Sequence, residues 1–464
     1  ETHRLTGPYL YTNRCGKPVD ELWTNLGPEV INISYTGSRS IIHRVIQIDF
    51  SSISAFLTGF STYPQPLRLR LRIFTIFFLY KQTHQTVRKG ELSTIMKLVF
   101  DKADLVKSVG IAMKAVSGKT TMPILECILI DASSNVIKFT SNDMELGIET
   151  IVTGMILERG IVALDAKIFS EIVRKLPDNQ VTIETDENLV TTITCEKAKF
   201  NIPGQSGEDF SYLPILETSD CVSISQFTLK ELIRQTIFSI AANENNKLMT
   251  GELFEIKDNT LRVVSLDGHR IAIRRIELKD SYPDRKVVVP GKTLNEISKI
   301  LSGEMDDQID IYFSENHIMF KFDDTTVVSR LIDGEYFRID QMLSSDYETK
   351  VTINKKEFLS CIDRATLLVK EGDKKPIIID IQDGAMELQI NSAMGSMKEE
   401  IDINKEGKDI MIGFNPKFLI DALRVIDDEE ISIYLVNPKA PCFIRNEEES
   451  YIYLILPVNF NSVR

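Results

Sequence analysis

The sequence predicts an α+β protein built from three tandem domains, and two observations support this prediction. An apolar strand that runs directly into the start of a helix recurs at residues 97–105, 222–232 and 351–358. The spacing of about 126 residues indicates whole domains, because solenoid repeats recur every 20–50 residues or so. A chain of 464 residues also has room for about three domains.

Each long repeat contains a second strand-helix unit, at residues 161–176, 287–301 and 410–426. Apolar residues recur there at positions i, i+3, i+4 and i+7, the spacing of short amphipathic helices. Each domain therefore consists of two strand-helix-strands units.

Strands with alternating apolar and polar residues follow each second helix, at residues 181–185, 309–313 and 431–435. Such alternation is typical of half-buried strands in antiparallel sheets. We expect two helices per domain on one side and antiparallel sheets on the other, with domains at residues 96–220, 221–346 and 347–461. The joints fall near the short polar stretches at residues 219–220 and 344–346.

The first 95 residues differ from the rest, since all 13 methionines lie at or after Met96. We expect residues 1–95 to be a translated upstream region, with the native protein starting at Met96; a disordered extension is the alternative. The apolar run at residues 73–80 is far shorter than the roughly 20 residues that span a bilayer. The N-terminus also lacks a signal-peptide pattern.

The composition is ordinary for a soluble globular protein, with 43% hydrophobic and 26% charged residues. The six cysteines are scattered without C-x-x-C spacing, which argues against a zinc site or a disulfide framework and indicates a cytoplasmic protein. No P-loop, H-E-x-x-H motif or nucleophile motif is present, so no cofactor, metal or catalytic residue is expected.

Basic residues occupy the same position in the three second helices, at Arg174, Lys299 and Arg424. The outer face of any amphipathic helix needs charge, so each residue alone has an ordinary explanation. Repetition at the domain period favours a shared basic lining in a chain whose net charge is −13. Such a lining would bind the phosphates of duplex DNA without reading its sequence.

Four segments in order carry a resemblance to a known family: residues 117–125, 267–272, 412–416 and 454–458. With them, residues 96–460 resemble the bacterial DNA polymerase III beta subunit, or sliding clamp, of the Firmicute branch. The resemblance implies three DNA-clamp domains per chain in a head-to-tail homodimer, a ring with helices lining the hole and sheets on the outer rim. It also implies a processivity factor of DNA replication that slides on double-stranded DNA and is not an enzyme. Its partners would be the polymerase III catalytic subunit, the clamp loader and other proteins with a clamp-binding motif.

The resemblance further implies a hydrophobic pocket for partner peptides between the second and third domains. Its residues would be Asn246, Met249, Leu266, Gly268, His269, Arg270, Ile271, Ser344, Asn415, Phe418, Leu454, Leu456, Pro457 and Val458. Ser344 and Asn246 depart from the family pattern, in which proline and arginine are common. From the residues alone, Asp267-Gly268 is a hairpin turn and residues 456–458 end a last strand with an edge proline.

The resemblance also implies residues for DNA and for the dimer seam. The resemblance assigns Lys119 and Lys247 to DNA contact, and Arg174, Arg234, Lys299 and Arg424 are expected to contact DNA as cations of the predicted helices. Phe200 and Ile202 of the first domain would meet Leu367 and Leu368 of the third domain in the other chain, although core packing also explains these four residues.

Two other classes of function compete with this interpretation. An enzyme is disfavoured, because His269 and His317 have no nucleophile or metal motif beside them. A multi-domain protein-interaction scaffold that does not encircle DNA is the stronger alternative. The two differ in whether Arg174, Lys299 and Arg424 converge on one surface.

Overall fold

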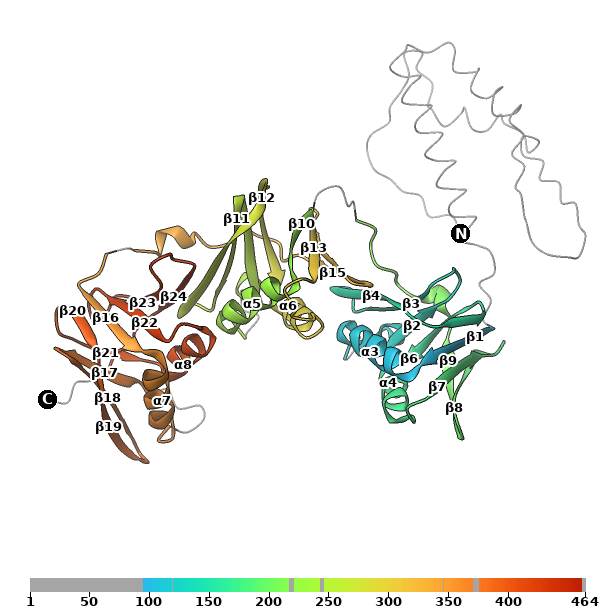
Figure 1. The fold of residues 1–464 in the computed structure, drawn as a ribbon, viewed down its shortest axis with the longest axis horizontal. Helices are drawn as coiled ribbons and strands as arrows, with labels where there is room; N and C mark the ends of the chain where they lie inside the picture. Colours follow the sequence, from blue (N-terminus) through green and yellow to red (C-terminus); the bar gives the residue numbers. More distant parts are fainter. Residues whose placement is uncertain are drawn as a thin grey trace, which may run out of the picture. The chain divides into compact units, whose positions relative to one another are not determined.

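The structure is a computed structural model that describes residues 95–118, 120–216, 221–242, 246–344, 346–369 and 375–460. The prediction for residues 1–95 lies outside these residues except at Ile95, and so does the predicted DNA contact Lys119. The predicted joints lie beside gaps in the description, so the domain boundaries stay predictions. We call the part from Met96 to Asp209 domain I, from Cys221 to Arg330 domain II and from Thr349 to Ile455 domain III (Figure 1).

The described residues form six α-helices, two per domain as predicted. They are α3 (Lys102–Ala112), α4 (Ala166–Lys175), α5 (Gln226–Thr236), α6 (Gly291–Ser298), α7 (Lys355–Thr366) and α8 (Pro416–Val425). Five begin at a residue whose side chain accepts a backbone N–H of the first turn: Asp101, Asp165, Ser225, Asn354 and Asn415. These caps satisfy N–H groups that a helix start leaves unpaired. Four of these caps are the last residue of a strand, and Asn415 directly follows β21, so the strand-into-helix pattern was visible in the sequence.

Each domain also has its own strands. Domain I contains β1 (Met96–Asp101), β2 (Cys127–Asp131), β3 (Ile137–Asn142), β4 (Leu146–Val152), β5 (Met155–Glu158), β6 (Ile161–Asp165), β7 (Gln180–Thr185), β8 (Val190–Cys195) and β9 (Ala198–Gln205). Domain II contains β10 (Cys221–Ser225), β11 (Gly251–Leu266), β12 (Arg270–Pro290), β13 (Gln308–Phe313), β14 (His317–Phe322) and β15 (Thr325–Arg330). Domain III contains β16 (Thr349–Asn354), β17 (Ile377–Gln382), β18 (Ala385–Ser392), β19 (Gly395–Asp402), β20 (Asn404–Gly407), β21 (Ile410–Phe414), β22 (Glu430–Leu435), β23 (Cys442–Arg445) and β24 (Tyr451–Ile455).

The sheets cross the domain joints, which the sequence did not reveal. A 13-stranded sheet joins domains I and II, where β4 pairs with β15 in antiparallel orientation. A seven-stranded sheet joins domains II and III through the antiparallel pair β12 and β24. A third sheet, in the order β19-β18-β17-β21, belongs to domain III alone. Each joint is therefore held by continuous backbone hydrogen bonds.

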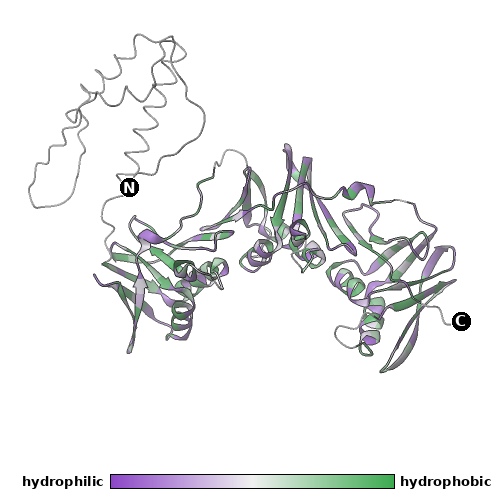
Figure 2. Cartoon of the chain, turned by 180° about the vertical axis from the view of Figure 1, so that it is seen from behind, coloured by the Kyte–Doolittle hydropathy of each residue, from purple (hydrophilic) through white to green (hydrophobic). Residues whose placement is uncertain are grey.

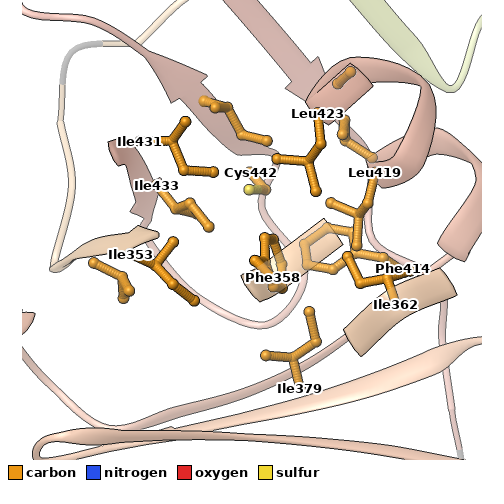
Figure 3. Close-up of a cluster of buried hydrophobic side chains, with 14 of the residues drawn as sticks. Ile353, Phe358, Ile362, Ile379, Phe414, Leu419, Leu423, Ile431, Ile433 and Cys442 are labelled. Atoms are coloured by element: carbon orange, nitrogen blue, oxygen red, sulfur yellow. The ribbon is translucent and has the colours of Figure 1, made fainter. Parts of the chain in front are cut away.

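The helices of each domain pack in pairs against the sheets: α3 with α4, α5 with α6, and α7 with α8 (Figure 1). Hydrophobic and hydrophilic residues interleave along the strands, as Figure 2 shows, so each sheet has a buried and a solvated face. In domain III the core gathers around Phe358, which lies among Ile379, Phe414 and Leu419 from three other elements (Figure 3). Such burial is the main source of each domain's stability.

One helix is shorter than predicted. The apolar spacing predicted a helix continuing to residue 301, but α6 ends at Ser298. Lys299 is its C-cap, and the Leu301 N–H still donates to the Ile297 carbonyl at 3.1 Å. The apolar pattern continues because Leu301 remains buried in a terminal turn.

Candidate functional site

The turn between β11 and β12 positions the first predicted pocket residues. The Asp267 carboxylate accepts the N–H groups of His269 and Arg270, at 2.9 Å and 3.1 Å. Gly268 adopts φ = 87°, a left-handed conformation that glycine reaches without strain. The turn thus exposes His269 and directs Arg270 toward domain III.

Arg270 lies at the joint between domains II and III and is only 8% exposed. Its guanidinium pairs with Asp267 at 3.0 Å and with Asp421 of α8 at 2.7 Å. It also donates to the Phe238 carbonyl and lies 5.3 Å and 4.5 Å from the ring centroids of Phe238 and Phe418. These contacts satisfy its donors within the protein, so Arg270 organises the site and offers little free hydrogen-bonding capacity.

Leu266, Ile271 and Leu454 of the predicted pocket lie in one buried cluster, whereas Phe418 packs against the domain III core. Leu266 pairs with Ile271 across the β11–β12 hairpin, and Ile271 pairs with Leu454 of β24. Partly buried residues pack against this cluster: Met249, Leu248, Ile332, Phe337 and Leu343. We call Leu248, Met249 and Leu343 the apolar patch. The patch could bury the hydrophobic side chains of a short peptide.

The C-terminal residues close the other side of the site. The Leu456 N–H donates to the His269 carbonyl at 2.9 Å, and the Val458 N–H donates to the Gly413 carbonyl at 2.8 Å. The ring centroids of His269 and Phe418 lie 6.0 Å apart. The Asn415 side chain caps the start of α8 by accepting the Lys417 N–H. Pro457 lies between Leu456 and Val458, whose N–H groups make the two hydrogen bonds above.

Two predicted pocket residues serve local structure. Asn246 caps the short helix η7 (Lys247–Thr250) by accepting the Leu248 N–H at 3.1 Å. The Ser344 hydroxyl accepts the Asp346 N–H at 3.1 Å. Both residues are exposed, and their part in any peptide contact stays a prediction.

The three repeated cations are exposed at equivalent positions. Arg174, Lys299 and Arg424 each lie nine residues after the N-cap of their helix, with 61%, 53% and 60% of the side chain exposed. Arg174 pairs with Glu171 and lowers the pKa of that carboxyl, while Lys299 pairs with Glu296 at 2.7 Å. Exposed pairs of this kind are weak, so a phosphate can replace the carboxylate.

The remaining predicted DNA contacts have different surroundings. Arg234 is held at the joint of domains II and III, where it bonds Glu231, Asp427 at 2.9 Å and the Val425 carbonyl at 3.2 Å. Only 35% of its side chain is exposed, so it is less available to phosphates than the repeated cations. Lys247 is exposed at the start of η7.

The predicted seam residues lie beside strand edges. Phe200 is 40% exposed and Ile202 is 8% exposed, both on β9. Leu367 is 75% exposed just after α7, and Leu368 packs partly against the domain III core.

Sequence reasoning missed several residues that build the site. Phe238, Asp421 and Asp427 complete the contacts of Arg270 and Arg234, and Leu248 and Leu343 belong to the apolar patch. Asp421 matches Glu171 and Glu296 by repeat position, but it pairs across the joint. No signal within the repeat distinguishes this choice of partner.

The described residues hold neither a candidate metal site nor a membrane-spanning helix. They contain no group of three or more histidine, cysteine, aspartate or glutamate residues arranged to hold a metal ion. They also contain no helix that is both long enough and apolar enough to cross a membrane.

Comparison with known proteins gives consistent results along the described chain. Models of the DNA polymerase III beta subunit match in chain order: the N-terminal domain at residues 96–214, the central domain at 223–337 and the C-terminal domain at 340–459. The beta sliding clamp of Staphylococcus epidermidis is 33% identical over 375 residues, 78% of this chain and 99% of the relative. A structure from Eubacterium rectale, named as a DNA polymerase III beta subunit, is 72% identical with a TM-score of 0.77, covering 79% of this chain and 100% of that one. The sliding clamp of Bacillus subtilis is 35% identical with a TM-score of 0.76 over the same shares.

Proposed function

Because the chain belongs to the DNA polymerase III beta subunit family, we propose that it is a processivity factor of DNA replication. In this proposal two copies close a ring that encircles and slides on duplex DNA and tethers the replicative polymerase. It acts in the cytoplasm, is loaded onto DNA by a clamp loader and catalyses no reaction itself. The alternative of a scaffold that does not encircle DNA is not favoured, because the relatives are named sliding clamps.

Ring closure is supported by two strand edges, one in domain III and one in domain I, that lack the pairing seen at the equivalent edges of the internal joints. At each internal joint, the second strand of a hairpin in one domain pairs with the last strand of the next domain. In domain I the hairpin is β3–β4, and β4 pairs with β15. In domain II the hairpin is β11–β12, and β12 pairs with β24. The corresponding strands still available are β19 of domain III and β9 of domain I. Within the described residues, β19 pairs only with β18, and β9 has a second neighbour only at Gly204 and Gln205. An exposed strand edge presents unpaired backbone N–H and C=O groups that can form hydrogen bonds with a strand of another chain.

Repeat geometry also sets the register of this pairing. The last strands follow turn residues with positive φ, at Glu196, Asp323 and Glu449. At both joints, the fifth residue after the turn residue pairs with the hairpin residue that lies five positions after its own hairpin partner. Val328 pairs with Gly147, whose hairpin partner is Asn142. Leu454 pairs with Ile271, whose hairpin partner is Leu266. The matching residue of β19 is Ser396, by its hairpin partner Asn391. The same rule places Ser396 opposite Asn201 of the partner subunit.

It follows that Met397 lies opposite Phe200 of the partner subunit. Met397 packs partly against the domain III core, and Phe200 is exposed in the single chain. Their contact would bury an aromatic ring against a flexible apolar side chain, a favourable cross-strand pair. Leu367 and Leu368 lie on the same domain and would extend the seam.

A cysteine cross-link tests the ring and its register together. We expect the double variant Phe200→Cys with Met397→Cys to form a covalently closed dimer on mild oxidation. The control Phe200→Cys with Lys398→Cys shifts the register by one residue and points the second thiol to the other face of the strand, so it should cross-link poorly. A monomeric mass for the unmodified chain at micromolar concentration would contradict the proposal.

DNA encirclement is tested by topology. We expect the protein to stay on nicked circular DNA only after a loader has acted, and to escape when that DNA is cut into a linear form. Retention on linear, free-ended DNA at moderate salt would instead show ordinary phosphate binding, whose affinity falls steeply with salt.

A further inference from the structure

Domain II buries a carboxylic acid where a core residue is expected. Glu252 on β11 is 0% exposed, and neither of its carboxyl oxygens has a hydrogen-bond partner in the described part of the protein. An ionised carboxylate without a partner is too costly to bury, so such groups are paired or neutral.

The other two domains carry isoleucine at this position. Glu252 pairs with the residue just before the N-cap of α6, as Ile128 does for α4 and Ile377 does for α8. Both isoleucines are 0% exposed in their cores. The acid is therefore a substitution particular to domain II, since the fold itself accepts an apolar residue here.

A second difference between domains I and II lies at the ends of α3 and α5, where threonine stands in domain II and alanine in domain I. Both helices have 11 residues, and they end at Ala112 and Thr236. The hydroxyls of Ser141 and Ser265 donate to the carbonyls of these two residues, each at 2.5 Å, so the two positions are equivalent.

A third difference lies in the short helix that follows each of these, where serine stands in domain II and alanine in domain I. η3 (Met113–Ala115) ends at Ala115, and its counterpart η6 (Ile237–Ser239) ends at Ser239. Both α5 and η6 pack against β11. Domain II has thus replaced two alanines and an isoleucine by two hydroxyls and an acid, and all three replacements are buried.

The direction of the hydrogen bonds favours the neutral acid. The Thr236 hydroxyl donates its proton to the Leu232 carbonyl at 2.6 Å, so its oxygen is left to accept. Only a protonated Glu252 can donate to it. The Ser239 hydroxyl, on η6 that packs against β11, is also buried without a hydrogen-bond partner in the described residues.

The elements that pack against β11 bury uncharged residues. These are Thr236 from α5, Ser239 from η6 and Val289 from β12, while α6 buries Gly291, Thr293, Leu294 and Ile297. Burial raises the pKa of Glu252 to about 8; the Thr236 hydroxyl would lower this pKa only by leaving the Leu232 carbonyl and donating to the carboxylate instead. Tyr336 is its titratable neighbour; burial first, and then the charge of Glu252, raises the pKa of that phenol.

We propose that Glu252, Thr236 and Ser239 form a buried proton-binding site, in which the folded protein holds Glu252 as the neutral acid. The unfolded chain binds this proton only below about pH 4.5, whereas the folded chain keeps it to about pH 8. Folding therefore takes up one proton between these values, so stability falls as the pH rises through that window and is flat above it. One proton corresponds to a tenfold change in the unfolding equilibrium per pH unit or so.

Infrared spectroscopy of the full chain detects the acid directly. At neutral pH the exposed carboxyls are ionised, so a carbonyl band of a protonated carboxylic acid would report Glu252. We expect this band in the unmodified protein and its loss in Glu252→Gln, with no loss in the control Glu315→Gln, an exposed acid of the same domain. A neutral-pH spectrum without the band would overturn the proposal.

The unfolding of domain II gives a second measurement. We expect the unmodified protein to lose stability between about pH 5.5 and about pH 7.5, and Glu252→Gln to lose this slope. If the glutamine variant does not fold, the triple variant Thr236→Ala, Ser239→Ala, Glu252→Ile restores the apolar trio of domain I and should also lack the slope. An unchanged slope in the variant that folds would contradict the proposal. Neither readout depends on DNA or on a partner.

Discussion

The Arg270 guanidinium of domain II lies 2.7 Å from the Asp421 carboxylate of domain III and contacts the rings of Phe238 and Phe418. This pair connects the two domains beside the backbone bonds of β12 and β24. Because the arginine is 8% exposed, its loss would leave the partly buried Asp267 and Asp421 without their cation.

We therefore expect Arg270→Met to weaken the joint between domains II and III. Removing one partner of a buried ion pair costs about 3–5 kcal/mol. Hydrogen exchange along β12 and β24 should accelerate, and the temperature of unfolding should fall. The control is Lys408→Gln, which removes an exposed pair with Glu348 and should change neither measurement. Equal effects of the two substitutions would show that Arg270 is not a structural bridge.

The apolar patch gives a prediction about peptide binding. Met249→Ala should weaken binding of a clamp-binding peptide about fivefold or more, since truncating a central apolar contact typically costs over ~1 kcal/mol. Met305→Ala is the matched control, because Met305 is a 68% exposed methionine of the same domain outside the patch. Fluorescence anisotropy with a labelled peptide measures both. Unchanged affinity in Met249→Ala would place the peptide elsewhere.

The local structure could be predicted from the sequence because the signals are local. Strand patterns and the caps Asp101, Ser225 and Asn354 are short-range features, and the repeat presents each three times. The apolar residues Leu266, Ile271 and Leu454 were assigned together through the resemblance, and the structure brings them together.

Side-chain pairing across the joints could not be predicted in the same way. Arg234 and Arg424 look alike as cations late in a helix, yet Arg234 binds Asp427 across a joint and Arg424 stays exposed beside Asp363 of its own domain. Partners of this kind are set by tertiary packing between residues distant in the chain. The continuity of the sheets through β4 and β15 was missed for the same reason.

The repeated cations predict a defined salt dependence. If Arg174, Lys299 and Arg424 each bind a phosphate, replacing all three with glutamine should lower the slope of log affinity against log salt by about 2–3. The control neutralises three exposed cations of the β11–β12 hairpin, Lys257, Lys279 and Arg285, and should leave the slope unchanged. Equilibrium binding to short duplex DNA at low salt measures both slopes. Equal slopes in the two variants would place the DNA on another surface.

The buried acid predicts a reciprocal experiment in domain I. Ile128→Glu places an acid at the equivalent position, where Ala112 and Ala115 supply no hydroxyl. Burying an unpaired polar group costs about 2–7 kcal/mol, so this variant should unfold domain I at a much lower temperature. Adding Ala112→Thr and Ala115→Ser supplies the two hydroxyls that domain II provides, and part of the lost stability should return. If the triple variant is no more stable than Ile128→Glu alone, the hydroxyls do not support the acid. Domain II must then hold Glu252 by its packing rather than by Thr236 and Ser239.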